Sequence, residues 1–269
     1  MKYKFGFIGC GNMGSALAAA CSGKTDPSLI SLSDSFEEKA KELSLKLSAS
    51  LNPTKITVKE SKYIFIAVKP QTLSALFDEI REDIKEREAP PIFITMAAGT
   101  SIEKLCSLIG KEYPTIRIMP NTPVAVGCGM TLYTYNDLVS KDILDDFLFS
   151  LEYSGMLLYA SEDKFDSESI VTGCGPAYSF MFIEAMAKAA EALGASPDAA
   201  RLYAIQTVLG AATLAKSSDK SLEELCRNVC SPGGSTIEGV KVLREDDLYK
   251  SVKNAALASY NRTLEMKKL

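Results

Sequence analysis

Histidine is absent from this chain of 269 residues. Its absence excludes imidazole general bases, Ser-His and Cys-His nucleophile pairs and most zinc sites. Any chemistry must therefore come from a bound cofactor or from carboxyl, hydroxyl, amine and backbone groups.

An excess of basic residues is also missing, because 34 acidic side chains outnumber 30 Lys and Arg side chains and leave a net charge of -4. This balance does not favour binding of nucleic acid or of an anionic membrane. The longest apolar stretch carries Glu184, Lys188 and Glu191, which argues against a membrane span. Since a strand-like run begins at Lys4, no signal peptide is predicted and a cytoplasmic protein is expected.

C-x-x-C pairs are missing as well, although the chain contains seven cysteines. An odd number of cysteines without such a pair is typical of small buried residues that stay reduced in the cytosol. Cys226 and Cys230 lie four residues apart, but no third or fourth ligand stands near them in the sequence. No metal site is predicted.

The most informative feature that is present is a glycine-rich turn near the start of the chain. The apolar run Lys4–Ile8 predicts a buried strand, and the small residues of Ser15–Cys21 predict a helix packed on a sheet. Between them Gly9, Gly11 and Gly14 follow G-x-G-x-x-G spacing. In that motif the glycines allow a tight turn, a close approach to pyrophosphate and close packing of helix on strand. The order of strand, glycines and helix predicts dinucleotide binding.

A second predicted strand at 28–33 ends in an acidic residue. Asp34 lies 20 residues after Gly14, where this type of fold places a carboxylate on the adenosine ribose. An aspartate there favours NAD over NADP, whereas the neighbouring serines and Lys39 are able to donate to a 2′-phosphate, so the preference stays open. The alternative is that Asp34 only caps the helix predicted at 36–47.

Strands and helices alternate up to about residue 160, which predicts a doubly wound sheet. The remaining strands are predicted at 62–68, 91–96, 116–119, 129–134 and 155–159, and the helices at 72–84, after Thr100 or Ser101, and at 140–151. Because ligands bind beyond the carboxyl ends of such strands, one crevice should collect Gly9–Gly14, Val68–Gln71 and Ala97–Gly99.

From Ser161 onward helical periodicity replaces the strand pattern. The segments 176–193 and 199–216 are almost wholly apolar, so each helix must be buried on most of its circumference. A domain of about 110 residues does not easily enclose two such helices alone. We therefore expect a second copy of the chain to cover them in an intertwined dimer, the alternative being an ordinary monomeric helical core. The fold class is thus α/β: a Rossmann-type doubly wound domain over 1–160, followed by an all-α dimerisation and substrate-binding domain over 161–269.

Two small-residue segments interrupt the helical half. In the loop 230–236 the backbone N–H groups and the hydroxyls of Ser235 and Thr236 stand at a predicted helix start, a place suited to a carboxylate or a phosphate. The alternative is a plain connection in which one of these hydroxyls is the N-cap. The segment Gly173–Pro176 is predicted to be a close-approach turn, with Pro176 at the first position of the apolar helix.

With these segments in place, the whole chain resembles the pyrroline-5-carboxylate reductase family. The resemblance rests on the segments GFIGCGNMGSA (6–16), AVKPQ (67–71), AAGTSI (97–102), MPNTP (119–123), GCGPAYSF (173–180) and SPGGSTIEGV (231–240). It implies reduction of 1-pyrroline-5-carboxylate to proline with NADP(H) or NAD(H), in a homodimer that in some members assembles into a ring of dimers.

The resemblance also implies site residues. It implies cofactor-binding positions at Ile8, Gly9, Cys10, Gly11, Asn12, Met13, Ala67, Val68, Lys69, Pro70, Ala97 and Asn228. The glycine motif and the end of the second predicted strand add Gly14, Ser33 and Asp34 to the cofactor-binding set. Substrate-binding positions are Glu162, Gly234, Ser235 and Thr236, with Thr236 placed beside the ring nitrogen as the catalytic residue. Serines after the second strand meet the 2′-phosphate in this family, and Asp34 departs from that pattern.

Two other classes remain as alternatives. A reductase of β-hydroxy acids would share the first domain, but it would need a catalytic lysine in a G-x-x-x-N-x-x-K-like helix, and the segment after Gly173 has none. A non-catalytic dinucleotide-binding regulator would not need the loop 231–236.

Overall fold

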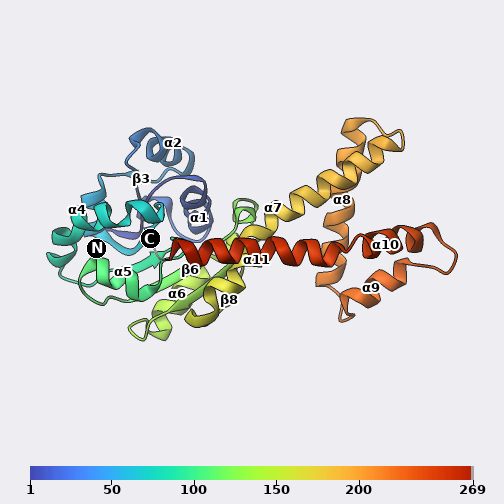
Figure 1. The fold of residues 1–269 in the computed structure, drawn as a ribbon. Coiled ribbons are helices and arrows are strands. Elements are labelled where there is room, and N and C mark those ends of the chain that lie inside the picture. The colour runs from blue at the N-terminus through green and yellow to red at the C-terminus, as the bar shows by residue number, and fades with distance from the viewer. Residues whose placement is uncertain (268–269) are drawn as a thin grey trace. The chain divides into compact units, whose positions relative to one another are not determined.

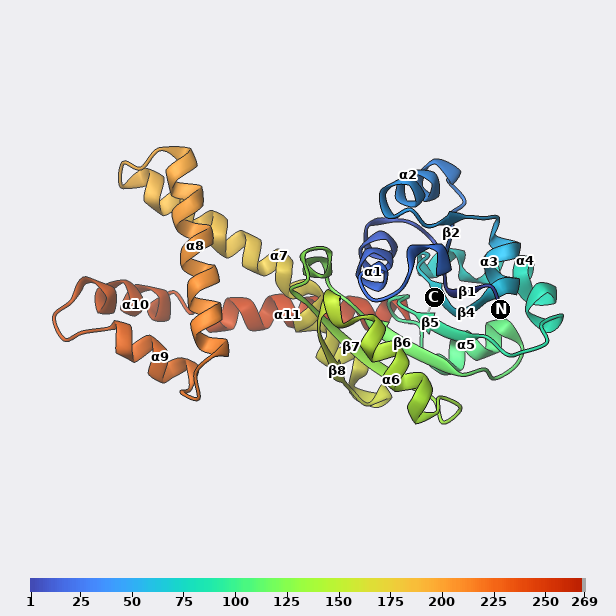
Figure 2. The ribbon, with the colours of Figure 1, turned by 180° about the vertical axis from the view of Figure 1, so that it is seen from behind.

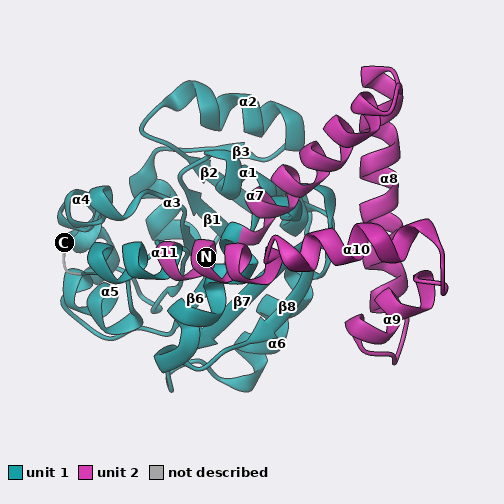
Figure 3. Cartoon of the chain, turned by 45° about the vertical axis from the view of Figure 1, so that its right-hand side comes forward, with its two compact units in different colours: residues 1–174, 259–269 teal, residues 175–258 magenta. Residues whose placement is uncertain are grey.

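The computed structural model describes residues 1–267. Contacts divide the chain into two compact units (Figure 3). Unit 1 comprises Met1–Cys174 together with the C-terminal segment from Ser259, and unit 2 comprises Gly175–Ala258.

Unit 1 is built on an eight-stranded sheet in the order β3-β2-β1-β4-β5-β6-β7-β8 (Figures 1 and 2). The strands are β1 Tyr3–Ile8, β2 Ile30–Ser33, β3 Ser50–Leu51, β4 Ser61–Ile66, β5 Ile92–Thr95, β6 Thr115–Met119, β7 Gly129–Tyr135 and β8 Gly155–Tyr159. All neighbours from β3 to β6 are parallel, β7 runs antiparallel to β6, and β8 is parallel to β7. The chain order reverses beside β1, which is the point where such sheets bind ligands.

Helices connect these strands. They are α1 Asn12–Ser22, α2 Glu37–Leu47, α3 Thr54–Glu60, α4 Leu73–Lys85, α5 Ile102–Ile109 and α6 Lys141–Ser150, with 3-10 turns at Pro27–Leu29, Pro70–Thr72, Thr122–Val126 and Glu152–Ser154. The predicted doubly wound sheet is confirmed, and Ser101 rather than Thr100 caps α5 by accepting from the Lys104 N–H. The short elements β3 and α3 were not predicted, because each is too short to show a periodic pattern of apolar residues.

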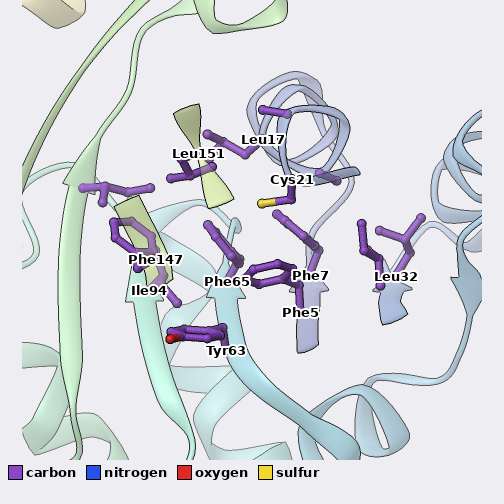
Figure 4. Packing of buried hydrophobic residues seen from close by; sticks show 14 of the residues in the cluster. Phe5, Phe7, Leu17, Cys21, Leu32, Tyr63, Phe65, Ile94, Phe147 and Leu151 are labelled. Carbon is purple, nitrogen blue, oxygen red and sulfur yellow. The ribbon is translucent and has the colours of Figure 1, made fainter. Parts of the chain in front are cut away.

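Aromatic side chains form the core on one face of the sheet. Phe7 and Phe65 are fully buried and stack with their ring centroids 4.3 Å apart. Leu17 and Cys21 of α1 lie over these rings (Figure 4). Ile64, next to Phe65 in β4, belongs to the cluster on the opposite face, because successive strand residues point to opposite sides. Each such side chain contributes about 1.5–3 kcal/mol when fully buried.

A polar cluster joins α6 to the sheet. The Asp146 carboxylate accepts hydrogen bonds from Lys4 Nζ at 2.6 Å and from the Tyr63 hydroxyl at 2.9 Å. Burial acts to raise the pKa of Asp146, but these hydrogen bonds and the charges of Lys4 and Lys62 outweigh it and hold the pKa below its ordinary value. Asp146 therefore stays ionised and keeps α6 attached to β1 and β4.

Helices alone make up the described part of the chain after Ser161. They are α7 Glu162–Ala192, α8 Pro197–Lys216, α9 Leu222–Val229, α10 Ser235–Glu245 and α11 Leu248–Met266. By length and composition α7 would also qualify as a membrane span, a test that core helices of soluble proteins pass as well.

Unit 2 has almost no core of its own. Within its residues, all of which are described, only Ala200 and Ala204 are buried, while Phe180, Met181 and Leu209 are 63%, 70% and 56% exposed. The alternative of an ordinary monomeric helical core is therefore wrong. Exposed apolar surface on this scale is typical of a protein–protein interface.

The predicted turn at Gly173–Pro176 is wrong, because α7 begins at Glu162 and continues through Pro176. A proline inside a helix leaves the carbonyl four residues earlier without its N–H partner. Here that carbonyl belongs to Thr172, and it accepts a hydrogen bond from Asn121 Nδ2 at 2.9 Å. A long-range partner thus allows the helix to continue.

The expectation of buried cysteines is only partly correct. All seven lie within the described residues and are free thiols. Cys10 and Cys21 are buried as expected, but Cys128 is exposed and the other four are half-buried, so the expectation is wrong for these five.

Candidate active site

The three glycines after β1 differ in what surrounds them. Gly9 has a φ of +103°, and a Cβ there would lie 2.5 Å from the Ala67 carbonyl oxygen. A Cβ on Gly14 would lie 2.1 Å from the Gly9 carbonyl oxygen, whereas one on Gly11 would meet none of the described atoms within 4 Å. Gly9 and Gly14 are therefore required by backbone packing, and Gly11 leaves open space at the start of α1.

Hydrogen bonds hold this loop against the neighbouring strands. Gly9 N–H donates to the Ser33 carbonyl of β2 at 2.8 Å, and Ala67 N–H donates to the Ile8 carbonyl at 2.8 Å. The N-cap of α1 is Gly11, which offers no side chain to the first N–H groups. These N–H groups and the helix dipole suit an anionic phosphate.

Asp34 is directly attached to the glycine loop. Its Oδ2 accepts from the Cys10 N–H at 2.6 Å, and its Oδ1 accepts from the Phe36 N–H at 2.8 Å. The helix α2 begins at Glu37 with Phe36 as its N-cap, so the alternative that Asp34 only caps this helix is wrong. Instead the carboxylate connects the loop after β1 to the turn after β2.

The Cys10 thiol is not a nucleophile. Burial raises its pKa to about 12, and the Asp34 carboxylate adds to the rise. The thiol is therefore protonated at neutral pH, and its Sγ contacts the Ser33 carbonyl at 3.5 Å.

A groove of about 560 Å³ extends from the loop between α1 and α2. Its lining includes Cys10, Gly11 and Asn12 of the loop together with Lys39, Glu42 and Lys46 of α2. The groove thus combines the open glycine with a polar wall, as a bound dinucleotide requires.

The other predicted cofactor residues of unit 1 lie at the same edge of the sheet. Met13 belongs to α1, Ala67–Pro70 follow β4, and Ala97 follows β5, where it is buried. Because β1, β4 and β5 are parallel neighbours, their carboxyl ends bring these segments together with the glycine loop.

Glu162 lies at the first turn of α7 and is held by unit 1. Its Oε1 accepts from Arg117 at 2.9 Å and from the Ile102 N–H at 3.2 Å. Arg117 is 1% exposed, also forms an ion pair with Asp166, and stands 4.4 Å from the Phe165 ring centroid.

The predicted substrate residues other than Glu162 belong to unit 2, as does Asn228. Asn228 is in α9, and Ser235 and Thr236 are the first two residues of α10. The N-cap of α10 is Gly234, for which the structure has no side-chain cap among the described residues. The alternative that Ser235 or Thr236 is the N-cap is therefore wrong. The exposed hydroxyls and the uncapped N–H groups remain available for an anion.

Sequence reasoning missed the roles of Arg117 and Asn121. Arg117 interrupts the apolar strand TIRIM, and a lone arginine in a buried strand is itself a signal of paired acids. Asn121 joins α7 to β7, since its Oδ1 also accepts from the Met130 N–H at 2.9 Å. No local pattern could have named its partners.

Comparison with known proteins covers both halves of the chain. The family model described as pyrroline-5-carboxylate reductase dimerisation matches residues 162–266, and the model described as NADP oxidoreductase, coenzyme F420-dependent, matches residues 4–99. The chain is 34% identical to the pyrroline-5-carboxylate reductase of Aquifex aeolicus, over 100% of this chain and 97% of that protein.

Solved structures agree with this similarity. A pyrroline-5-carboxylate reductase from Coxiella burnetii superposes with a TM-score of 0.89 at 29% identity, with 100% of both chains covered. The pyrroline carboxylate reductase of Plasmodium falciparum, solved with NADP bound, has a TM-score of 0.86 at 26% identity, with 99% of both chains covered.

Proposed function

This chain belongs to the pyrroline-5-carboxylate reductase family, and from that premise we propose that it reduces 1-pyrroline-5-carboxylate to L-proline with NADH or NADPH, the last step of proline biosynthesis. The observation that carries this function is the similarity over the whole chain to proteins of that activity. Such agreement disfavours both a β-hydroxy acid reductase and a non-catalytic regulator.

The cofactor is held by the edge of the sheet beside β1. The loop Ile8–Gly14 binds the pyrophosphate through the open space at Gly11 and the N-terminus of α1, and the half-buried Asp34 faces the adenosine ribose. The Ser33 side chain is buried and its hydroxyl donates to the Phe7 carbonyl at 3.1 Å, so Ser33 supports this edge from within β2. The segment Ala67–Pro70, together with Ala97, completes this set within unit 1. Asn228 of unit 2 is carried as a further cofactor position on the family resemblance alone. When bound, the nicotinamide supplies the hydride, and the protein supplies binding, orientation and exclusion of water.

The substrate is held by the start of α10. The N–H groups after Gly234 and the Ser235 hydroxyl bind the carboxylate, because this helix end has no side-chain cap of its own. The Thr236 hydroxyl lies beside the ring nitrogen and accepts a hydrogen bond from the protonated imine N–H, so that the C=N bond stays electrophilic. Glu162 is carried as a further substrate-side residue on the family resemblance; in unit 1 its Oε1 is held by Arg117 and the Ile102 N–H.

The active form is a homodimer, as the dimerisation model over 162–266 indicates. The exposed apolar side chains of unit 2 supply the surface that a second copy covers. We further propose a functional division into a dinucleotide-binding domain, 1–160, and a dimerisation and substrate-binding domain, 161–269. The protein is soluble, as its relatives are, and we place it in the cytoplasm. We also propose that its dimers assemble further into a ring of dimers, as the family resemblance implies.

The test is pyrroline-5-carboxylate-dependent oxidation of NADH and NADPH by the purified protein. Turnover with either supports the reductase, and no turnover in protein that binds the cofactor would overturn it. Thr236→Ala should lower kcat/KM by about 10²-fold, the effect of losing one hydrogen bond made mainly in the transition state. The control is Thr207→Ala in α8, where the hydroxyl bonds to the Tyr203 carbonyl of its own helix.

A further inference from the structure

The carboxylate of Asp34 is fixed in place from both sides. Oδ2 accepts from the Cys10 N–H of the glycine loop at 2.6 Å, and Oδ1 accepts from the Phe36 N–H before α2 at 2.8 Å. Both donors are backbone groups of ordered segments. The carboxylate therefore cannot turn away from the loop without losing two charge-assisted hydrogen bonds.

These two bonds leave part of the carboxylate available. An ionised carboxylate offers about four acceptor positions, and the two backbone donors occupy one on each oxygen. The side chain is half-buried, so the remaining positions are open to a ligand. Two adjacent acceptor positions match the two vicinal hydroxyls of a ribose, which are both donors.

The groove between α1 and α2 has no excess positive charge that would bind the 2′-phosphate by which NADPH differs from NADH. Lys39 and Lys46 line it, and Glu42 and the adjoining Asp34 balance them. Lys39 Nζ lies 5.1 Å from the Phe36 ring centroid. The first 80 residues contain no arginine, the side chain that usually pairs with a ribose 2′-phosphate in this fold.

We propose that Asp34 is a specificity-determining residue that makes this protein selective for NADH over NADPH. It accepts hydrogen bonds from the ribose hydroxyls and repels a 2′-phosphate, which carries a charge of about -1.5 to -2. This inference rests on the proposed function, because it assumes that the glycine loop holds the pyrophosphate. For a fixed carboxylate about 5 Å from such a phosphate, Coulomb repulsion in a water-like dielectric corresponds to about tenfold weaker binding.

The experiment is isothermal titration calorimetry of the full-length dimer with NADH and with NADPH, in the absence of substrate. We expect the wild-type protein to bind NADH at least about tenfold more tightly. Asp34→Ser should bring the two dissociation constants to within about threefold, mainly by strengthening NADPH binding. The matched control is Glu42→Gln, which removes an acidic charge from the same groove but should change the ratio less, because no backbone N–H pair fixes Glu42 at the ribose position as one fixes Asp34.

Several results would overturn the proposal. They are equal or tighter binding of NADPH by the wild type, an unchanged ratio in Asp34→Ser, or an equal change in Glu42→Gln. If Asp34→Ser does not fold, titration of the wild type with 5′-AMP and adenosine 2′,5′-bisphosphate gives the same comparison, and preference for the bisphosphate refutes it. Absence of pyrroline-5-carboxylate turnover with either cofactor, with NADH selectivity intact, would instead refute the proposed function.

Discussion

Replacement of Arg117 by methionine should strongly destabilise unit 1. The guanidinium is almost fully buried and binds Glu162 and Asp166, both in the first two turns of α7. Methionine keeps much of the volume but leaves the Asp166 carboxylate, which is only 6% exposed, with Lys267 as its remaining ion-pair partner among the described residues.

The size of the effect follows from the burial of the charges. Removal of one partner from a buried ion pair typically costs about 3–5 kcal/mol, because the other charge stays buried and uncompensated. Because Lys267 still pairs with Asp166, we expect a loss at the lower end of this range, about 3 kcal/mol, for Arg117→Met. Arg117→Lys should lose part of it, since a single ammonium cannot reproduce a planar fork that reaches two carboxylates.

The assay is urea denaturation followed by circular dichroism, at one fixed dimer concentration for all variants because association contributes to stability. Hydrogen exchange should show the added opening in the first turns of α7. The double variant Arg117→Met/Asp166→Leu should recover most of the loss, because the deeply buried carboxylate is then removed and Glu162, at 37% exposure, keeps contact with water. A loss below about 1 kcal/mol in Arg117→Met, or no recovery in the double variant, would refute this reasoning.

Three further predictions test the loop, a pH dependence and the dimer. Gly14→Ala should destabilise the fold by about 1–3 kcal/mol or more through its clash with the loop backbone, whereas Gly11→Ala should leave the urea midpoint unchanged and weaken NADH binding in calorimetry; the reverse pattern would contradict the assignment. Burial acts to raise the pKa of Asp146, but hydrogen bonds from lysine and tyrosine outweigh it and lower this pKa below the unfolded-state value of 3.8. The stability that the Asp146 carboxylate contributes is therefore present above pH 3.8 and is lost as the pH falls through the lower, folded-state pKa. Asp146→Asn should flatten the plot of urea midpoint against pH in that range, and an unchanged slope would refute this. Leu209→Lys should weaken dimerisation in sedimentation equilibrium, while Leu45→Lys, an exposed leucine of unit 1, should not, and equal effects would count against unit 2 as the interface.

Local patterns were sufficient where the physical cause is local. The packing of Gly9 and Gly14 follows from a strand, a tight turn and a helix within a few residues, and their spacing expressed it directly. The apolar runs likewise predicted the strands, since a parallel strand covered on both faces has to be apolar throughout.

Long-range contacts decided what local patterns could not. Proline at position 176 indicated the start of a helix, but Asn121, which is far away in the sequence, supplies the donor that lets α7 pass through it. The same holds for Arg117, whose role depends on two acids that only the folded chain brings to it.

The sequence by itself determined the glycine loop, the change from a strand-rich to a helical half, and the need for a second copy, because spacing, periodicity and an excess of apolar surface are properties of the chain. Only the tertiary structure decided how Asp34 is held, where α7 begins, and which charges are buried together. A hydrogen bond or an ion pair between distant segments exists only when the fold places both partners within reach and removes the water that would otherwise replace them.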